Sequence, residues 1–564
     1  MFLMHAKSRW FLAGACLLTG LVWGVRAELA ADEYDPIAAA AQANSTLGNQ
    51  PGDAPQLGLS HYRNNVTGSA IPTEWNVKTG QNIKFAARLG SQTYASPVVA
   101  NGKVFVGTNN SAGFVKRFPS KIDLGCLVAY DANNGKFLWQ HSNEKLPTGR
   151  VNDWEQLGIC SSPIVSGNRL WYISNRDELC CLDTEGFLDG ENDGPFKEEP
   201  NQNTDEADVV WKLDLMKLGA SPHNASSCSI TLVGDVLLAT TSNGVDEGHK
   251  KVAQAQAPVF IAVNKNTGAL LWSDGSSGTN IMHGTWSSPC YGVLGGTPQA
   301  IFAGGDGWLY SFDLNGENGK AKLLWKFDCN PKASIYKLER ATRNPLIGTP
   351  VIYDGLVYVG VGEDPEHGEG NGHLWCVDPT KRGDVSPTLV FNSQAPTKPI
   401  EYKRVQALEE KKGDFERPND NSALVWHYEG TDTKKFESTM HRTLASATVK
   451  NNLLFIADQS GLFHCLDAKT GKPHWTHDLL AASWSTTLIA GDKVYICDVD
   501  GQVAIFELSA TKNMIAELDL DTPVYTTPVV ANGVLYVATF NTLYAIQEGA
   551  SFKPGSDAAA GGGQ

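Results

Sequence analysis

Most of the chain consists of short apolar runs, rich in β-branched and aromatic residues, that are separated by turns containing Gly. Residues 96–106 read SPVVANGKVFV, and residues 527–537 repeat the pattern as TPVVANGVLYV. In both copies two apolar runs flank Asn-Gly, the pair that best tolerates the positive φ angles of a two-residue hairpin turn. Weaker copies begin near residues 162, 227, 288, 349, 446 and 489, so the sequence predicts eight β-hairpins.

A third strand follows each hairpin, and a small residue precedes its apolar–polar end. We expect this position to pack closely against the neighbouring sheet. In seven of the eight cases the residue is Ala, Ser or Cys, namely Ala129, Cys181, Ala262, Ser311, Cys376, Cys465 and Ala545.

A fourth strand is marked by Trp. Trp139, Trp272 and Trp475 each lie eight residues beyond the polar residue that ends a third strand. We expect Trp211, Trp325 and Trp426 to take the same role after insertions. Four antiparallel strands repeated eight times predict an all-β fold, an eight-bladed β-propeller spanning residues 71–550. Seven blades plus a divergent pair is the alternative.

The last repeat ends without a fourth strand, whereas residues 74–89 look like a fourth strand with no blade before them. Because soluble proteins avoid exposed sheet edges, we expect residues 74–89 to complete the last blade and close the ring.

The repeats resemble the pyrroloquinoline-quinone (PQQ) repeat, most closely in SPVVANGKVFVG and YDANNGKFLW. This repeat builds the propellers of quinoprotein alcohol dehydrogenases and of BamB-type outer-membrane assembly factors. The resemblance covers about residues 70–550 and implies the fold. It does not distinguish an enzyme from a noncatalytic scaffold.

The first 27 residues read as an export signal. Lys7 and Arg9 precede an apolar stretch, and Val25-Arg26-Ala27 offers a cleavage site, so we predict a mature start at Glu28 and a periplasmic or secreted protein. No membrane span is expected after cleavage. Residues 28–70 and 551–564 are expected to be a flexible N-terminal segment and a flexible tail.

The net charge and the long insertions indicate which classes of partner the chain could bind. The chain has a formal net charge of −15, which becomes −18 once the three basic residues of the signal are removed. Since phosphate binding needs a Lys/Arg surface, we expect no nucleic-acid partner. Long insertions at 184–208 and 379–440 favour contacts with an envelope protein or polymer.

Ten cysteines remain after cleavage. Cys180 and Cys181 are adjacent, as in the vicinal disulfide of quinoprotein methanol dehydrogenases, but the pair falls inside a third strand, where such a bridge fits poorly. We expect them, like the other cysteines at packing positions, to be small buried hydrophobes.

Two groups of residues are candidate sites. Asp189, Glu191 and Asp193 alternate as in the first half of a calcium loop, although Pro200 stands where the closing Glu would be. At the mouth of the channel, aromatic rings could stack on a flat ligand and cationic or polar groups could hold carboxylates. The candidates for this funnel are Trp286, Arg343, Asn344, His441, Arg442 and Trp484.

Two functions remain open at this point. The first is an exported, noncatalytic propeller that binds protein or polymer at the envelope, with a BamB-like assembly role among the options. The alternative is a PQQ- and calcium-dependent alcohol or sugar dehydrogenase. That enzyme class needs a calcium held by Glu and Asn and an Asp base, and no residues here match this set.

Overall fold

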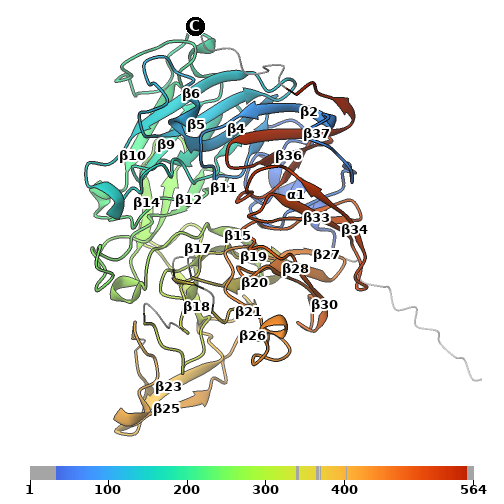
Figure 1. Cartoon of the computed structure of the whole chain (residues 1–564). Helices are drawn as coiled ribbons and strands as arrows, with labels where there is room; N and C mark the ends of the chain where they lie inside the picture. Colours follow the sequence, from blue (N-terminus) through green and yellow to red (C-terminus); the bar gives the residue numbers. More distant parts are fainter. Residues whose placement is uncertain (1–33, 338–341, 364–366, 369, 402, 555–564) are drawn as a thin grey trace, which may run out of the picture. The chain divides into compact units, whose positions relative to one another are not determined.

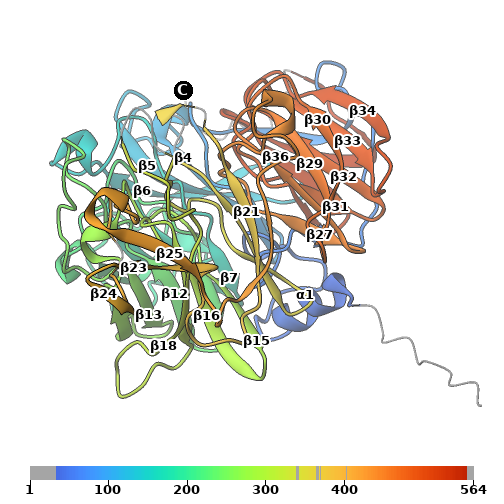
Figure 2. The ribbon, with the colours of Figure 1, turned by 90° about the horizontal axis from the view of Figure 1, so that it is seen from below.

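Eight sheets, each built around four antiparallel strands, follow one another along the chain. The structure is a computed structural model that describes residues 34–337, 342–363, 367–368, 370–401 and 403–554. In Figure 1 the colours pass from blade to blade in sequence order, and in Figure 2 the four strands of blade 7 lie side by side. The predicted eight-bladed, all-β architecture is confirmed.

The strands of each blade are consecutive, except for β26 in blade 5 and β2 in blade 8. Blades 1 to 4 are β3 (Val98–Ala100), β4 (Lys103–Asn109), β5 (Leu124–Asp131), β6 (Phe137–Glu144); β7 (Ile164–Ser166), β8 (Arg169–Ile173), β9 (Glu178–Asp183), β10 (Val209–Asp214); β11 (Thr231–Val233), β12 (Val236–Thr240), β13 (Phe260–Asn264), β14 (Leu270–Asp274); and β15 (Cys290–Leu294), β16 (Thr297–Ala303), β17 (Trp308–Asp313), β18 (Leu323–Asp328). Blades 5 to 8 are β19 (Val351–Tyr353), β20 (Leu356–Val361), β21 (His373–Val377), β26 (Leu424–Tyr428); β27 (Thr448–Lys450), β28 (Leu453–Ala457), β29 (Leu462–Asp467), β30 (Pro473–Asp478); β31 (Leu488–Ala490), β32 (Lys493–Cys497), β33 (Gln502–Glu507), β34 (Met514–Asp519); and β35 (Val529–Ala531), β36 (Val534–Ala538), β37 (Thr542–Ser551), β2 (Gln81–Arg88). Short 3₁₀ helices lie in the connections, namely η1 (Asn110–Ala112), η2 (Gly149–Val151), η3 (Gly186–Leu188), η4 (Met216–Leu218), η5 (Gly278–Asn280), η7 (Glu410–Lys412) and η8 (Phe436–Ser438).

The ring closes as the sequence predicts. Strand β2 pairs antiparallel with β37, and Phe85 faces Ala545 across the ladder. Figure 1 shows the blue strand beside the red one. The fourth strand of blade 8 therefore comes from residues before blade 1, and the two ends of the propeller are tied together in one sheet.

In blades 1 to 6 the small residue of the third strand lies opposite the Trp of the fourth strand in the same blade. Ala129, for example, pairs with Trp139, whose indole N–H donates to the backbone oxygen of Thr184 in blade 2 at 3.0 Å. Each indole thus crosses its own third strand and packs between blades, which requires a small side chain beneath it. The small residue is therefore needed mainly to make room for the Trp of its own sheet, and not for the neighbouring sheet as the sequence predicts. The other five pairs are Cys181 with Trp211, Ala262 with Trp272, Ser311 with Trp325, Cys376 with Trp426 and Cys465 with Trp475.

Residues 54–67 form a plug across one end of the channel. Arg63 is buried, and its guanidinium donates to the backbone oxygens of Leu57, Pro289, Ser229 and Ile230 and to the hydroxyl of Thr231. Arg63 thus contacts blades 3 and 4. The same segment also forms hydrogen bonds with the inner region of each of the six remaining blades, through Val99, Val165, Ile352, Val449, Ile489 and Pro528.

The expectation of a flexible segment over residues 28–70 is therefore corrected for residues 36–70. That segment begins with α1 (Pro36–Asn44) and includes β1 (Val66–Thr67), which pairs with the inner strand of blade 7. It is held because its polar groups satisfy the backbone of the inner strands, an interaction that composition does not reveal.

Part of the insertion in blade 5 forms a separate sheet of three strands, β23 (Thr388–Asn392), β24 (Ala395–Pro399) and β25 (Asp414–Pro418). The first strand of the insertion, β22 (Gly383–Asp384), instead pairs with β18 and extends the sheet of blade 4. Figure 1 shows β23 and β25 standing out from the blades, and Figure 2 gives the same sheet from below.

The ten cysteines of the described residues are free thiols. Cys180 and Cys181 both lie in β9, but Cys180 packs in the core between blades 1 and 2, whereas Cys181 packs in the core between blades 2 and 3. Their side chains point to opposite faces of the strand, as expected for packing residues.

The proposed signal at residues 1–27 lies outside the described residues, as do residues 555–564 of the expected tail. In the described residues no helix has the length and apolar character needed to cross a membrane.

Candidate functional site

A cavity of about 460 Å³ occupies the channel above the plug. Two stacked rings of side chains line it, and each blade contributes one residue to each ring. The ring nearer the plug consists of Ser96, Ser162, Ser229, Ser288, Thr349, Ser446, Thr486 and Thr527.

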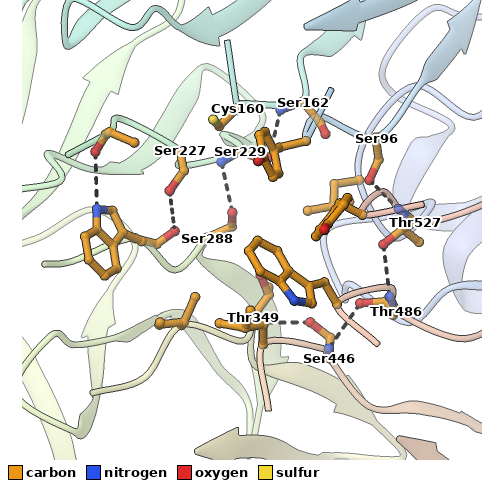
Figure 3. Close-up of a pocket in the computed structure, with 18 of the residues that line it drawn as sticks. Ser96, Cys160, Ser162, Ser227, Ser229, Ser288, Thr349, Ser446, Thr486 and Thr527 are labelled. Atoms are coloured by element: carbon orange, nitrogen blue, oxygen red, sulfur yellow. Dashed lines mark hydrogen bonds between the residues drawn. The ribbon is translucent and has the colours of Figure 1, made fainter. Parts of the chain in front are cut away.

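The hydroxyls of this Ser/Thr ring link neighbouring blades. The backbone N–H of Thr527 in blade 8 donates to Ser96 Oγ in blade 1 at 2.9 Å, and the N–H of Thr486 donates to Thr527 Oγ1 at 3.2 Å. The same bond joins blades 2 to 3, 3 to 4, 5 to 6 and 6 to 7, as the dashed lines in Figure 3 show. Six of the eight hydroxyls therefore satisfy a backbone donor of the preceding blade, and these six positions need a residue with an oxygen on Cβ.

The upper ring lies two residues before each Ser or Thr. Three aromatic residues from adjacent blades gather on one side, where the rings of Trp484 and Tyr525 meet edge to face at 4.6 Å and Tyr94 lies 5.4 Å from Tyr525. Trp286 of blade 4 stands opposite, four blades away. The full upper ring is Tyr94, Cys160, Ser227, Trp286, Ile347, Leu444, Trp484 and Tyr525, and it carries no formal charge.

Arg63 forms part of the floor. It is the one charged residue among the described residues that line the cavity. Burial lowers the pKa of Arg63 to about 10, so the guanidinium stays charged at neutral pH. Its donors already serve five protein oxygens, so the cation acts as the anchor of the plug.

The structure divides the six funnel candidates. Trp286 and Trp484 line the cavity, but Arg343 and Asn344 are fully buried and do not line it. Arg343 Nη2 lies 3.2 Å from Asp328 Oδ2, and the Asn344 backbone N–H donates to Asn330 Oδ1.

His441 and Arg442 are also held by protein groups. His441 Nδ1 lies 3.2 Å from Asp458 Oδ2, and Arg442 Nη1 donates to the backbone oxygens of His367 and Gly368 at 2.9 Å. Burial raises the pKa of Asp458, but hydrogen bonds from His441 and His464 outweigh burial and hold this pKa at about 2. These residues stabilise the loops around the mouth and do not enter the cavity.

The candidate calcium residues are partly engaged elsewhere. Asp193 pairs with Arg169 at 2.7 Å, and Asp189 Oδ1 accepts the backbone N–H of Glu191. The calcium site stays a prediction that these contacts do not favour.

A cluster of histidines lies beside the channel, and none of its members is among the six funnel candidates. His223, His249, His283, Glu363 and His367 come from loops of three blades and form two overlapping groups of potential metal ligands. No short motif marks them, because the ligands are spread over residues 223–367.

The comparisons with known proteins agree with the repeat pattern. The family model for the outer membrane protein assembly factor BamB matches residues 73–186 and 403–512. The BamB protein of Moranella endobia (strain PCIT) is 21% identical over 422 residues, which cover 72% of this chain and 83% of that protein. The chain is therefore similar to propellers of the PQQ-repeat family.

Solved structures with a similar fold include dehydrogenases. A quinohemoprotein alcohol dehydrogenase from Comamonas testosteroni matches with a TM-score of 0.55 and 13% identity, covering 92% of this chain and 85% of that chain. A second one, from Pseudomonas putida, matches with a TM-score of 0.53 and 11% identity, covering 92% and 83%. At these identities the likeness shows the fold alone.

The cavity of this propeller does not fit PQQ and calcium. Calcium takes oxygen ligands that normally include carboxylates, and no described lining residue is Asp or Glu. PQQ carries three carboxylates, yet the one cation among the described lining residues, Arg63, already donates its hydrogen bonds to oxygens of the plug and the blades. The donor set instead suits an uncharged ligand with flat or apolar parts.

Proposed function

We propose that this chain is an exported, noncatalytic binding protein of the cell envelope that takes an uncharged part of a protein or polymer partner into its channel mouth. The observation that carries this proposal is the pair of uncharged rings above a closed floor. Aromatic side chains supply large contact area, and the ring hydroxyls can still donate hydrogen bonds to a bound group.

The envelope location is supported by the signal-like residues 1–27 and by the relative named as an outer membrane protein assembly factor. Sequencing of the N-terminus of the chain purified from its own cells tests it. A start at Glu28 in an envelope fraction is expected, and an uncleaved cytosolic chain would contradict export.

A photo-crosslinking amino acid placed at Trp484 or Tyr525 tests the binding site. The matched control is Leu270, which is 40% exposed on the outer strand β14. We expect a discrete crosslinked partner from the two mouth positions and none from Leu270. Equal labelling at all three positions would contradict a site in the channel.

A second experiment distinguishes the proposed binding protein from a PQQ-dependent dehydrogenase. The mature chain is mixed with PQQ and calcium and assayed for quinone absorbance and for dye reduction with alcohols. We expect neither. Stoichiometric quinone binding with turnover would overturn the noncatalytic function.

A further inference from the structure

Three histidines from blades 3 and 4 converge beside Trp286, just outside the channel cavity. His223 precedes the first strand of blade 3, His249 lies in the loop between β12 and β13, and His283 precedes the first strand of blade 4. One ligand nitrogen from each lies within 4.8 Å of the others. We propose that His223, His249 and His283 bind a divalent transition-metal ion of the zinc class.

Hydrogen bonds orient two of the three rings for coordination. His223 Nδ1 lies 2.9 Å from the backbone oxygen of Val245, so this nitrogen carries the proton and Nε2 carries the lone pair. Nε2 points at His249 Nε2, 3.0 Å away. A carbonyl on the far nitrogen is the usual way in which proteins fix the tautomer of a metal-binding histidine.

Glu363 plays the corresponding part for His283. Its Oε1 lies 3.2 Å from His283 Nδ1, and both side chains are fully buried. With Nδ1 turned to this carboxylate, His283 would coordinate through Nε2, in the carboxylate–histidine–metal arrangement. His367, whose Nδ1 lies 3.9 Å from the same oxygen, extends the group on the side of blade 5.

The spacing suits a tetrahedral ion. Zinc–nitrogen bonds of about 2.0–2.1 Å place neighbouring ligand nitrogens about 3.4 Å apart. The 3.0 Å between the Nε2 atoms of His223 and His249 is close to this value. The His283 ring centroid lies 4.7 Å from the centroids of both other rings, so small side-chain rotations complete the site.

The loops that carry the ligands are locked together. Val245 N donates to the backbone oxygen of His283 at 2.8 Å, and a Cβ at Gly244 would lie 2.6 Å from both the His223 Cβ and the His283 oxygen. From the insertion, Arg404 donates to the backbone oxygens of Ile281 and Met282. A braced backbone of this kind lowers the reorganisation that metal binding requires.

The test uses the untagged mature chain, stripped with a chelator and titrated with Zn²⁺ by calorimetry, with metal content checked by mass spectrometry. We expect one tight zinc per chain and at least 100-fold weaker binding in His249→Gln, which changes a partly exposed loop residue. His474→Gln, an exposed histidine, should bind as the wild type does. Folding of each variant is checked by circular dichroism.

A second cluster provides the discriminating control. His373, His427 and Glu429 on blade 5 also form a potential ligand group. Loss of the zinc in His427→Gln but not in His249→Gln would overturn the assignment, as would a wild type that binds no zinc.

The wild type loaded with Cu²⁺ gives an independent readout if His249→Gln fails to fold. Electron paramagnetic resonance should then show coupling to imidazole nitrogens, and a spectrum with oxygen ligands alone would contradict the site.

Discussion

Trp325 donates its indole N–H to Gln299 Oε1 at 2.7 Å, whereas the equivalent tryptophans of five other blades donate directly to a backbone oxygen of the next blade. Gln299 passes the link on, because its amide nitrogen donates to the backbone oxygen of Pro379 in blade 5 at 2.9 Å. One glutamine therefore bridges blades 4 and 5 where the indole alone does not reach.

Gln299→Met should destabilise the propeller because it keeps the volume and removes this bridge. The substitution leaves the Trp325 indole N–H, the Ser311 hydroxyl and the Pro379 oxygen without their buried partner. We expect a loss of about 2–4 kcal/mol in the free energy of unfolding, since each unsatisfied buried group costs about 1–3 kcal/mol. Urea denaturation measures it. Gln202→Met, at an exposed position, should change nothing, and equal stability of the two variants would contradict the bridge.

The fold was accessible from sequence because its signals are local. The Asn-Gly turn of residues 101–102 lies within one blade, and so does the Trp that follows the third strand at a fixed distance in three repeats, so repetition exposes both signals. Contacts across the ring leave no such signal. Arg63 bonds to Ser229, 166 residues away, and nothing around Arg63 in the sequence indicates that it anchors a plug.

The six funnel candidates also show that sequence spacing does not reveal where a side chain points. Trp286 and Trp484 were found because they lie in the loops that enter first strands, and the position two residues before each Ser or Thr indeed faces the channel. Arg343 and Arg442 lie in the same loops. Their side chains turn instead toward the Asp328 carboxylate and the backbone oxygen of His367, and sequence spacing does not encode that choice.

Thr527→Val should weaken the seam between blades 7 and 8. The change keeps the shape of the side chain but removes the oxygen that accepts the Thr486 backbone N–H. We expect a loss of about 1–3 kcal/mol in unfolding free energy, because that buried donor is then unsatisfied. Thr527→Ser, which retains the oxygen, is the matched control and should lose less. A valine variant as stable as the serine variant would show that the ring of hydroxyls adds no stability.

His61 should make the stability of the plug depend on pH. Burial, and next the positive charge of Arg63, lower the pKa of His61 to about 4. In the unfolded chain His61 is protonated below about pH 6.5, whereas in the folded chain it stays neutral down to about pH 4. The free energy of unfolding therefore falls as the pH is lowered from about 6.5 to 4.

His61→Phe should remove this dependence. Between pH 7 and pH 5 we expect the wild type to lose up to about 2 kcal/mol more unfolding free energy than the variant. Denaturation curves at both pH values measure the difference, with His474→Phe as an exposed control. Parallel losses in the wild type and His61→Phe would contradict a neutral His61 in the folded chain.

The thiols should be almost inert in the folded chain. Burial raises the pKa of Cys180 to about 12 and also raises the pKa of Cys181. A maleimide reagent should label at most one cysteine before unfolding, namely Cys160, which is partly exposed and lines the channel cavity. Because burial raises the Cys160 pKa to about 12 as well, that labelling should be slow.

The Cys160→Ala variant should abolish the native labelling and leave nine thiols that react in denaturant. Peptide mapping without reduction should show Cys180 and Cys181 unbridged, since their side chains enter different cores on opposite faces of β9. A bridge between them would require the strand to leave its ladder with β8 and β10, so finding one would overturn the packing of blade 2.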